Sequence, residues 1–207
     1  MMQHKGTNSR GRYIAFEGVE GAGKSTIVAH VAKHLKDMGV SVVLVREPGG
    51  TKVGEHIREI LLGGEHQPGA RAEATLFAAA RAQLVVEKVT PALENGSWVL
   101  TDRSAYSSLA YQAVGRGLDL EEIRQLNDIA LGGVWPDTVI LLRLEAEAGL
   151  SRQAVGDRIG DESGAFHARV AEAFDMLAER EPDRFVVVDA SAPSEEVVAR
   201  VIGALEE

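Results

Sequence analysis

The sequence contains no cysteine among its 207 residues, which excludes disulfide bonds and thiolate chemistry. Its six histidines are scattered and form no HExxH pattern, which argues against a structural zinc site. Apolar runs are short, and none approaches the roughly 18 residues that span a bilayer. The chemistry of this chain therefore depends on residue types other than cysteine and histidine.

Positive charge is also scarce, with 22 Lys and Arg against 31 Asp and Glu, which gives a net charge of −9. Binding to DNA or RNA without sequence preference draws on clustered Lys and Arg, so this balance argues against a nucleic-acid partner. The first 12 residues, MMQHKGTNSRGR, are polar and lack the apolar core of a secretory signal. We therefore expect a mobile tail over residues 1–12 and a cytoplasmic protein without a membrane partner.

Short apolar, β-branched runs alternate with longer stretches of helical character over residues 13–207. Five strands are expected, over Tyr13–Phe16, Ser41–Val45, Trp98–Thr101, Thr138–Leu144 and Phe185–Val188. Helices are expected over Lys24–Met38, Val53–Leu62, Arg71–Leu93, Ser107–Ala113, Leu120–Leu131, Phe166–Glu181 and Glu195–Leu205, with Gly39, Gly96 and Gly132 at helix ends. This alternation predicts a single α/β domain with a parallel sheet covered on both faces, and ligands beyond the carboxyl ends of the strands.

A phosphate-binding motif follows the first expected strand and opens an expected helix. The residues GVEGAGKS, Gly18–Ser25, fit GxxxxGK(S/T) completely. Its glycines let backbone N–H groups surround a phosphate, and the helix N-terminus adds a favourable field. Lys24 is suited to reach the β and γ phosphates, and Ser25 to hold Mg²⁺. The predicted ATP-binding residues here are Gly18, Val19, Glu20, Gly21, Ala22, Gly23, Lys24, Ser25 and Thr26.

The phosphate motif alone leaves a kinase, a GTPase switch and an ATP-driven motor open. The sequence has no NKxD-type segment for reading guanine, which disfavours a GTPase. The segment TDRS, Thr101–Ser104, ends the third expected strand and offers more phosphate-binding candidates. Asp102 is suited to orient Mg²⁺ through water, and Arg103 to project towards the same crevice.

The segment REPGGT, Arg46–Thr51, narrows the choice among these classes of nucleotide-binding protein. Together with FEGVEGAGKST, GEHIREIL, TLFAAARAQLV, DRSAYSSLAYQ, GRG, WPDTVILL and DRIGDESGAFHARV, it makes the chain resemble thymidylate kinase, the bacterial type within the nucleoside monophosphate kinase family. The resemblance runs from Tyr13 to about Asp189. It implies a three-layer P-loop NTPase fold with a five-stranded parallel sheet and a short lid near residues 151–163. It also implies a homodimer that transfers the γ-phosphoryl group of ATP to dTMP with Mg²⁺.

The resemblance also implies an acceptor pocket. Phe77 would stack on the thymine ring, and Arg81, one helical turn later, would donate to thymine O4. Tyr111 would lie near the 2′ carbon of the sugar, where its bulk excludes a ribose hydroxyl. Arg58 and Arg103 would clamp the acceptor phosphate. The predicted dTMP site comprises Glu47, Pro48, Arg58, Phe77, Arg81, Arg103, Ser108, Tyr111 and Gln112.

The expected lid, GLSRQAVGDRIGDES, is shorter and less basic than is usual for bacterial members of the family. Gly160 stands where the family is often acidic. In the family, a phosphate loop without arginine goes with a catalytic arginine from the lid. Arg158 lies in the part that matches the family and is therefore preferred, while Arg152 is assigned to the ATP site. The predicted catalytic residues are Lys24, Arg103, Arg158 and Glu20, and the predicted metal ligands are Ser25 and Asp102.

A deoxynucleoside kinase stays open as a rival, because it shares the phosphate loop and the Asp-Arg pair. That chemistry needs a base for the 5′ hydroxyl, and Glu20 or Glu47 would have to supply it. The presence of both Arg58 and Arg103 favours instead an acceptor that brings its own phosphate. A nucleotide-dependent switch is the rival of another class, and it would need no thymine pocket.

Overall fold

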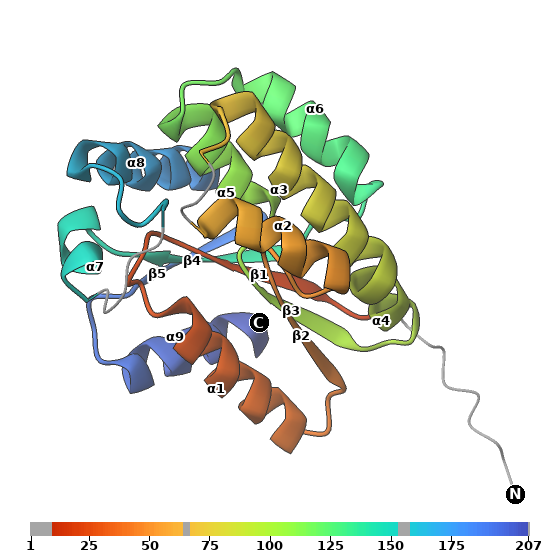
Figure 1. Ribbon diagram of the computed structural model, residues 1–207. Helices are drawn as coiled ribbons and strands as arrows, with labels where there is room; N and C mark the ends of the chain where they lie inside the picture. The colour runs from red at the N-terminus through yellow and green to blue at the C-terminus, as the bar shows by residue number, and fades with distance from the viewer. Residues whose placement is uncertain (1–9, 64–66, 153–157, 207) are drawn as a thin grey trace, which may run out of the picture.

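A five-stranded, all-parallel sheet lies between two layers of helices in the computed structural model, which describes residues 10–63, 67–152 and 158–206 (Figure 1). The strand order is β2-β3-β1-β4-β5. The strands are β1 (Tyr13–Glu17), β2 (Val42–Arg46), β3 (Trp98–Asp102), β4 (Thr138–Arg143) and β5 (Phe185–Asp189). The predicted fold class is confirmed, and each predicted strand is present with ends that differ by at most one residue.

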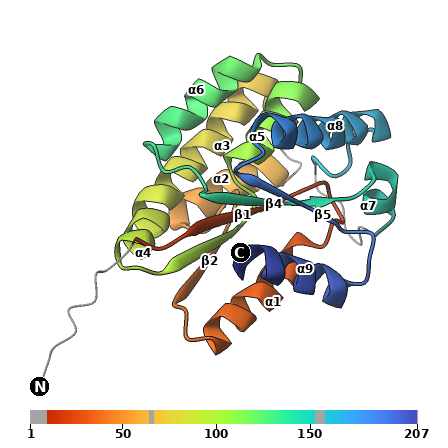
Figure 2. The same cartoon turned by 180° about the vertical axis from the view of Figure 1, so that it is seen from behind.

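Two helices cover one face of the sheet, and they lie side by side when the molecule is seen from behind (Figure 2). These are α1 (Lys24–Asp37) and α9 (Ser194–Glu206). The opposite face carries α2 (Lys52–Leu62), α3 (Ala70–Leu84), α4 (Thr90–Glu94), α5 (Ala105–Ser108), α6 (Leu120–Leu131) and α8 (Gly164–Arg180). Gly39, Gly96 and Gly132 lie just after α1, α4 and α6, as predicted.

The helices depart from the sequence predictions at three places. The helix expected over Arg71–Leu93 consists of α3, a π-helical segment η1 (Val85–Val89) and α4, and a second π-helical segment η2 (Leu109–Gly115) follows α5. A short helix that was not predicted, α7 (Ala146–Arg152), follows β4 and includes the start of the expected lid. A seven-residue helix is too short to show a clear apolar periodicity in sequence.

The central strand β1 explains why the strands read as almost continuous apolar runs. Ile14 and Phe16 pack into the core under α1 and α9, whereas Tyr13 and Ala15 pack into the core on the opposite face. All four side chains are fully buried. A parallel sheet covered on both faces requires this double burial.

The predicted tail and lid both extend into residues that the structure does not describe. Residues 1–9 of the tail and 153–157 of the lid lie outside the described residues. Residues 10–12 were also predicted as tail, but they contact the domain: Arg10 pairs with Asp137 at 2.9 Å, and the Gly11 N–H donates to the Leu93 carbonyl at 2.9 Å. Across the described ranges, the helices are all too short or too polar to cross a membrane.

Candidate active site

The phosphate motif forms the loop that joins β1 to α1, beyond the carboxyl end of the central strand. Gly21 has a φ of 72°, and a Cβ there would lie only 1.9 Å from the carbonyl oxygen of Gly149 in α7. Only glycine therefore fits this position. The Lys24 ammonium folds over the loop and donates to the carbonyl oxygens of Gly18 and Val19 at 2.9 and 2.8 Å.

Lys24 is buried, and its environment weakens its hold on a proton. Burial, assisted by the neighbouring Arg103 guanidinium, lowers the pKa of Lys24 to about 8. Nearby carboxylates, Asp102 first among them, oppose this shift. Lys24 is thus a cation whose charge is easily lost above neutral pH when the loop holds no anion.

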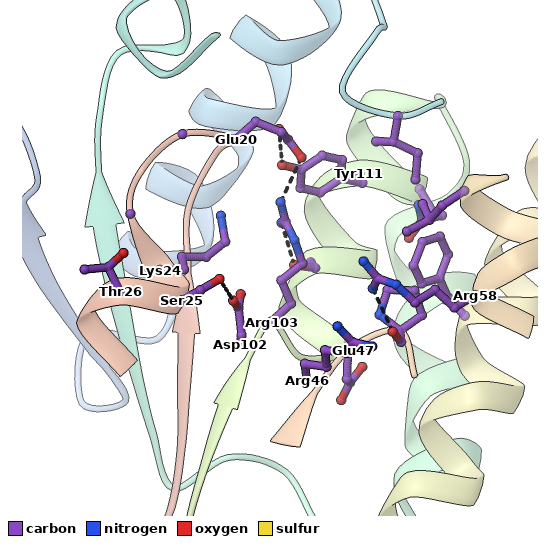
Figure 3. A pocket seen from close by; sticks show the side chains of 18 residues that line it. Glu20, Lys24, Ser25, Thr26, Arg46, Glu47, Arg58, Asp102, Arg103 and Tyr111 are labelled. Carbon is purple, nitrogen blue, oxygen red and sulfur yellow. Dashed lines mark hydrogen bonds and ion pairs between the residues drawn. The ribbon is translucent and has the colours of Figure 1, made fainter. Parts of the chain in front are cut away.

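Ser25, at the start of α1, meets Asp102, the last residue of β3. The Ser25 hydroxyl donates a hydrogen bond to Asp102 Oδ2 (Figure 3). Hydroxyl and carboxylate oxygens are the ligand types that Mg²⁺ prefers. No group of three or more His, Cys, Asp or Glu suited to a metal occurs among the described residues. These two oxygens therefore fit Mg²⁺ that takes its remaining ligands from water and nucleotide phosphates.

Arg103 turns out of the sheet directly after β3. Its φ of 71° lies in the left-handed region, which is uncommon for a residue with a side chain. The buried Glu17 carboxylate fixes this turn, because it accepts hydrogen bonds from the N–H and hydroxyl groups of both Ser104 and Ser107. The Arg103 guanidinium points towards the phosphate loop and donates to Glu20 Oε1 at 2.8 Å.

Glu20, in the middle of the phosphate loop, is contacted by three side chains, of which Figure 3 shows Arg103 and Tyr111. Besides the Arg103 contact, the Tyr111 hydroxyl donates to Glu20 Oε2 at 2.7 Å, and Nδ1 of His167 lies 3.2 Å from the same oxygen. Burial alone would raise the pKa of Glu20, but Arg103 and His167 outweigh it and hold that pKa well below its usual range. Glu20 is therefore ionised at neutral pH.

One cavity of about 420 Å³ extends from the phosphate loop to the predicted acceptor pocket. Residues of the phosphate loop, of the segment after β2, and of α2, α3, α5 and η2 line it together. The predicted site residues on its wall are Glu20, Gly21, Gly23, Lys24, Ser25, Thr26, Glu47, Pro48, Arg58, Phe77, Asp102, Arg103, Tyr111 and Gln112. The structure thus brings most of the predicted donor and acceptor residues into one space.

Two predicted dTMP residues, Arg81 and Ser108, lie behind this wall rather than on it. Arg81 is only 1% exposed, and its guanidinium donates to Glu47 Oε2 at 2.6 Å, to Ser108 Oγ at 3.2 Å, and to two further oxygens from Asn127 and Ser104. Burial raises the pKa of Glu47 to about 7, against the pull of Arg81. The part of Arg81 in reading the base stays a prediction.

The two predicted lid arginines bind other parts of the protein and do not line the cavity. Arg158 pairs with Glu73 of α3, with Nη2 and Oε2 2.5 Å apart, and its Nε donates to the Leu61 carbonyl at 2.7 Å. Arg152, at the end of α7, donates to the Ala190 carbonyl at 3.2 Å. Neither lines the cavity in this structure, so each would act on phosphate only after moving. Their catalytic roles stay predictions.

Several residues at or near the site were not predicted: Arg46, Leu62, Ser107 and Ile159 on the cavity wall, and Glu17, Glu73 and His167 near it. Glu17, Glu73 and His167 are each at most 1% exposed, and each bonds to a residue on another element. Glu73 carried a signal, because it stands four residues before Phe77 and so shares its helix face. Glu17 and His167 have partners that are distant in sequence, and no local pattern marks them.

Comparison with known proteins identifies the family of this chain. The family model described as thymidylate kinase matches residues 16–201. A thymidylate kinase from Halothermothrix orenii is 45% identical over 194 residues, covering 91% of this chain and 93% of the relative. One from Thermomicrobium roseum is 48% identical, covering 91% of each chain. A crystal structure of thymidylate kinase from Ehrlichia chaffeensis superposes with a TM-score of 0.81 at 31% identity, covering 96% of this chain and all of that one. The chain therefore belongs to the thymidylate kinase family.

Proposed function

We propose that this chain transfers the γ-phosphoryl group of ATP to dTMP and yields dTDP and ADP. The observation that carries the proposal is the single cavity that the phosphate loop shares with Arg58 and Phe77. A triphosphate on the loop and a monophosphate near Arg58 and Arg103 would meet in this space. Phosphoryl transfer depends on such positioning. Membership of the thymidylate kinase family supports the same donor and acceptor.

The main obstacle to this reaction is the repulsion between two phosphate groups. Lys24 would bind the donor phosphates once it leaves the loop carbonyls, and the helix N-terminus adds its field. Arg58 and Arg103 would hold the acceptor phosphate, and Arg103 is already aimed by Glu20. Mg²⁺ at Ser25 and Asp102 would supply further positive charge at the donor oxygens when bound. Catalysis is then mainly positioning and charge neutralisation.

The acceptor needs no general base, because its second phosphate pKa is about 6 and the attacking oxygen is already largely ionised at neutral pH. A deoxynucleoside kinase would need such a base. Glu20 is poorly suited to that task, because three side chains surround its carboxylate and its pKa is held low. These contacts argue against Glu20 as the base that a nucleoside kinase would need.

A steady-state assay with ATP across dTMP, dUMP, dCMP and thymidine tests the proposal. We expect dTMP to be the preferred acceptor and dUMP to be poorer by about 10–200-fold, the usual effect of one missing methyl group in an apolar pocket. Faster phosphorylation of thymidine than of dTMP would contradict the proposal. Thermal shift gives an independent comparison, with dTMP expected to stabilise the protein and thymidine or GTP to do so far less.

We further propose that the chain acts as a homodimer in the cytoplasm. Exposed apolar side chains lie on neighbouring elements of one helix layer: Val53 and Ile60 on α2, Val86 on η1 and Ile129 on α6 (Figure 1). Burial of such side chains between two copies would support association. Light scattering of the wild type and of Ile129→Glu tests this, with a dimer expected for the former and a shift towards monomer for the latter.

A further inference from the structure

Gln112 lines the cavity, and its amide group is bonded to a buried carboxylate behind it. Its Nε2 donates to Oε1 of Glu73 at 3.0 Å. An ionised carboxylate only accepts hydrogen bonds, whereas an amide has one donor end and one acceptor end. The amide nitrogen of Gln112 must therefore face Glu73, which leaves its carbonyl oxygen as the polar atom for the cavity.

Glu73 is kept ionised by two arginines from other elements. Arg116, just after η2, donates to it through Nε and Nη2 at 3.1 and 3.2 Å, and Arg158 donates at 2.5 Å. The Glu73 side chain is 1% exposed. Burial alone would raise its pKa, but the hydrogen bonds from Arg116 and Arg158 outweigh burial and lower it. Glu73 thus stays an acceptor, and Gln112 has no alternative orientation that keeps this hydrogen bond.

We propose that Glu73 is a specificity-determining positioning residue, which fixes the Gln112 amide so that the pocket presents an acceptor to the base. This inference rests on the proposed function. Thymine and uracil carry a hydrogen on N3 and can donate to such an oxygen. Cytosine carries a lone pair on N3, so two acceptors would face one another in a buried site. Glu73 never touches the substrate and acts only through Gln112.

The test is the preference for dTMP over dCMP in Glu73→Gln. A neutral amide at this position both donates and accepts, so Gln112 is free to rotate and present its NH₂ group to the base. We expect the ratio of kcat/KM for dTMP over dCMP to fall by about tenfold or more, the scale of one mismatched buried hydrogen bond. Calorimetry without ATP should show the same fall in the affinity ratio. The binding measurement also separates this inference from the proposed function, since it needs no phosphoryl transfer.

A double-variant cycle ties the effect to Gln112. Gln112→Leu should lower the same ratio, and Glu73→Gln combined with Gln112→Leu should lower it no further, because both changes remove one interaction. If the ratio falls additively in the double variant, Glu73 does not act through Gln112 and the inference is overturned.

Arg116→Gln is the matched control, because it weakens the support of Glu73 without changing the acceptor that Gln112 meets. It should lower Tm and leave the dTMP-to-dCMP ratio unchanged. If Glu73→Gln alone fails to fold, it is combined with Arg116→Gln, which removes a buried cation that would otherwise lack its partner. The dTMP-to-dCMP ratio of this double variant is then compared with that of Arg116→Gln alone. An unchanged ratio beside a lowered Tm would show that Glu73 is only a structural residue.

Discussion

Tyr111 and Glu20 are joined by a hydrogen bond of 2.7 Å between the phenol hydroxyl and the carboxylate, which ties η2 to the phosphate loop. The ring and the hydroxyl of Tyr111 therefore have separable tasks. Tyr111→Phe keeps the bulk that is predicted to exclude a ribose hydroxyl, so it should keep the preference for dTMP over its ribonucleotide. Tyr111→Ala should narrow this preference by about tenfold or more. Steady-state kinetics with dTMP and with its ribonucleotide measures this preference. If Tyr111→Phe and Tyr111→Ala lose the preference equally, the hydroxyl and not the ring excludes the ribonucleotide.

Lys24→Ala should abolish transfer while leaving dTMP affinity within about threefold, because the Lys24 ammonium lies on the phosphate loop and Phe77 lines the acceptor end of the cavity. Transfer is followed by a coupled assay and dTMP affinity by calorimetry. Phe77→Ala is the opposite variant, with dTMP affinity expected to fall more than ATP affinity. Loss of dTMP binding in Lys24→Ala would contradict this division between donor and acceptor ends.

The affinity for ATP should weaken as pH rises through about 8. The pKa of Lys24 is lowered to about 8, so Lys24 is charged below this pH and neutral above it. Because ATP binds the charged form, we expect about tenfold weaker binding at pH 9 than at pH 7. Calorimetry of the protein without dTMP measures this, and Lys24→Arg should remove the dependence. A flat profile in the wild type would show that another group holds the donor phosphates.

Arg81→Ala should destabilise the protein strongly, because it leaves the buried Glu47 carboxylate without its ion-pair partner. Breaking a buried pair from one side costs about 3–5 kcal/mol of unfolding free energy, which denaturant unfolding measures. The combined variant Arg81→Met with Glu47→Leu replaces both charges by apolar groups and should recover much of that loss. If Arg81→Ala is as stable as the wild type, the ion pair does not support the pocket wall.

Arg158→Ala should lower kcat about 10³-fold with little change in the KM for dTMP, if this residue supplies the lid arginine as predicted. Arg152→Ala should have the smaller effect. A purely structural role of Arg158 predicts a different result, because loss of its contact with Glu73 alone would lower Tm and leave kcat unchanged. Near-normal kcat in both single variants and in the double variant would rule out the lid-arginine hypothesis.

The fold was predictable because its signals are local. Each strand is a short apolar run, and the phosphate loop carries its glycines and Lys24 in one stretch of sequence. The split of one expected helix into α3, η1 and α4 was not predictable, since a single wide turn hardly disturbs the apolar spacing.

The predicted site falls short where function depends on contacts between distant segments. The resemblance assigned Arg81 to the base, and its place four residues after Phe77 indicates a shared helix face, but neither shows how many protein oxygens surround the guanidinium. Glu73 and His167 were missed for the same reason. Their partners lie on other elements, so the spacing that places Glu73 on the helix face of Phe77 gives no sign of which residues it pairs with.

The position of β1 at the centre of the sheet has a consequence for synthesis of the chain. β1 is made before the other strands, yet it pairs only with β3 and β4, whose registers begin at Val99 and Thr138. Its side chains, four of which are apolar or aromatic, must therefore wait for their partners until most of the polypeptide has left the ribosome. Such long-range parallel pairing forms slowly and leaves apolar, aggregation-prone surface exposed until it is complete. The strand that carries the phosphate loop is thus the segment for which a chaperone has the longest time to act.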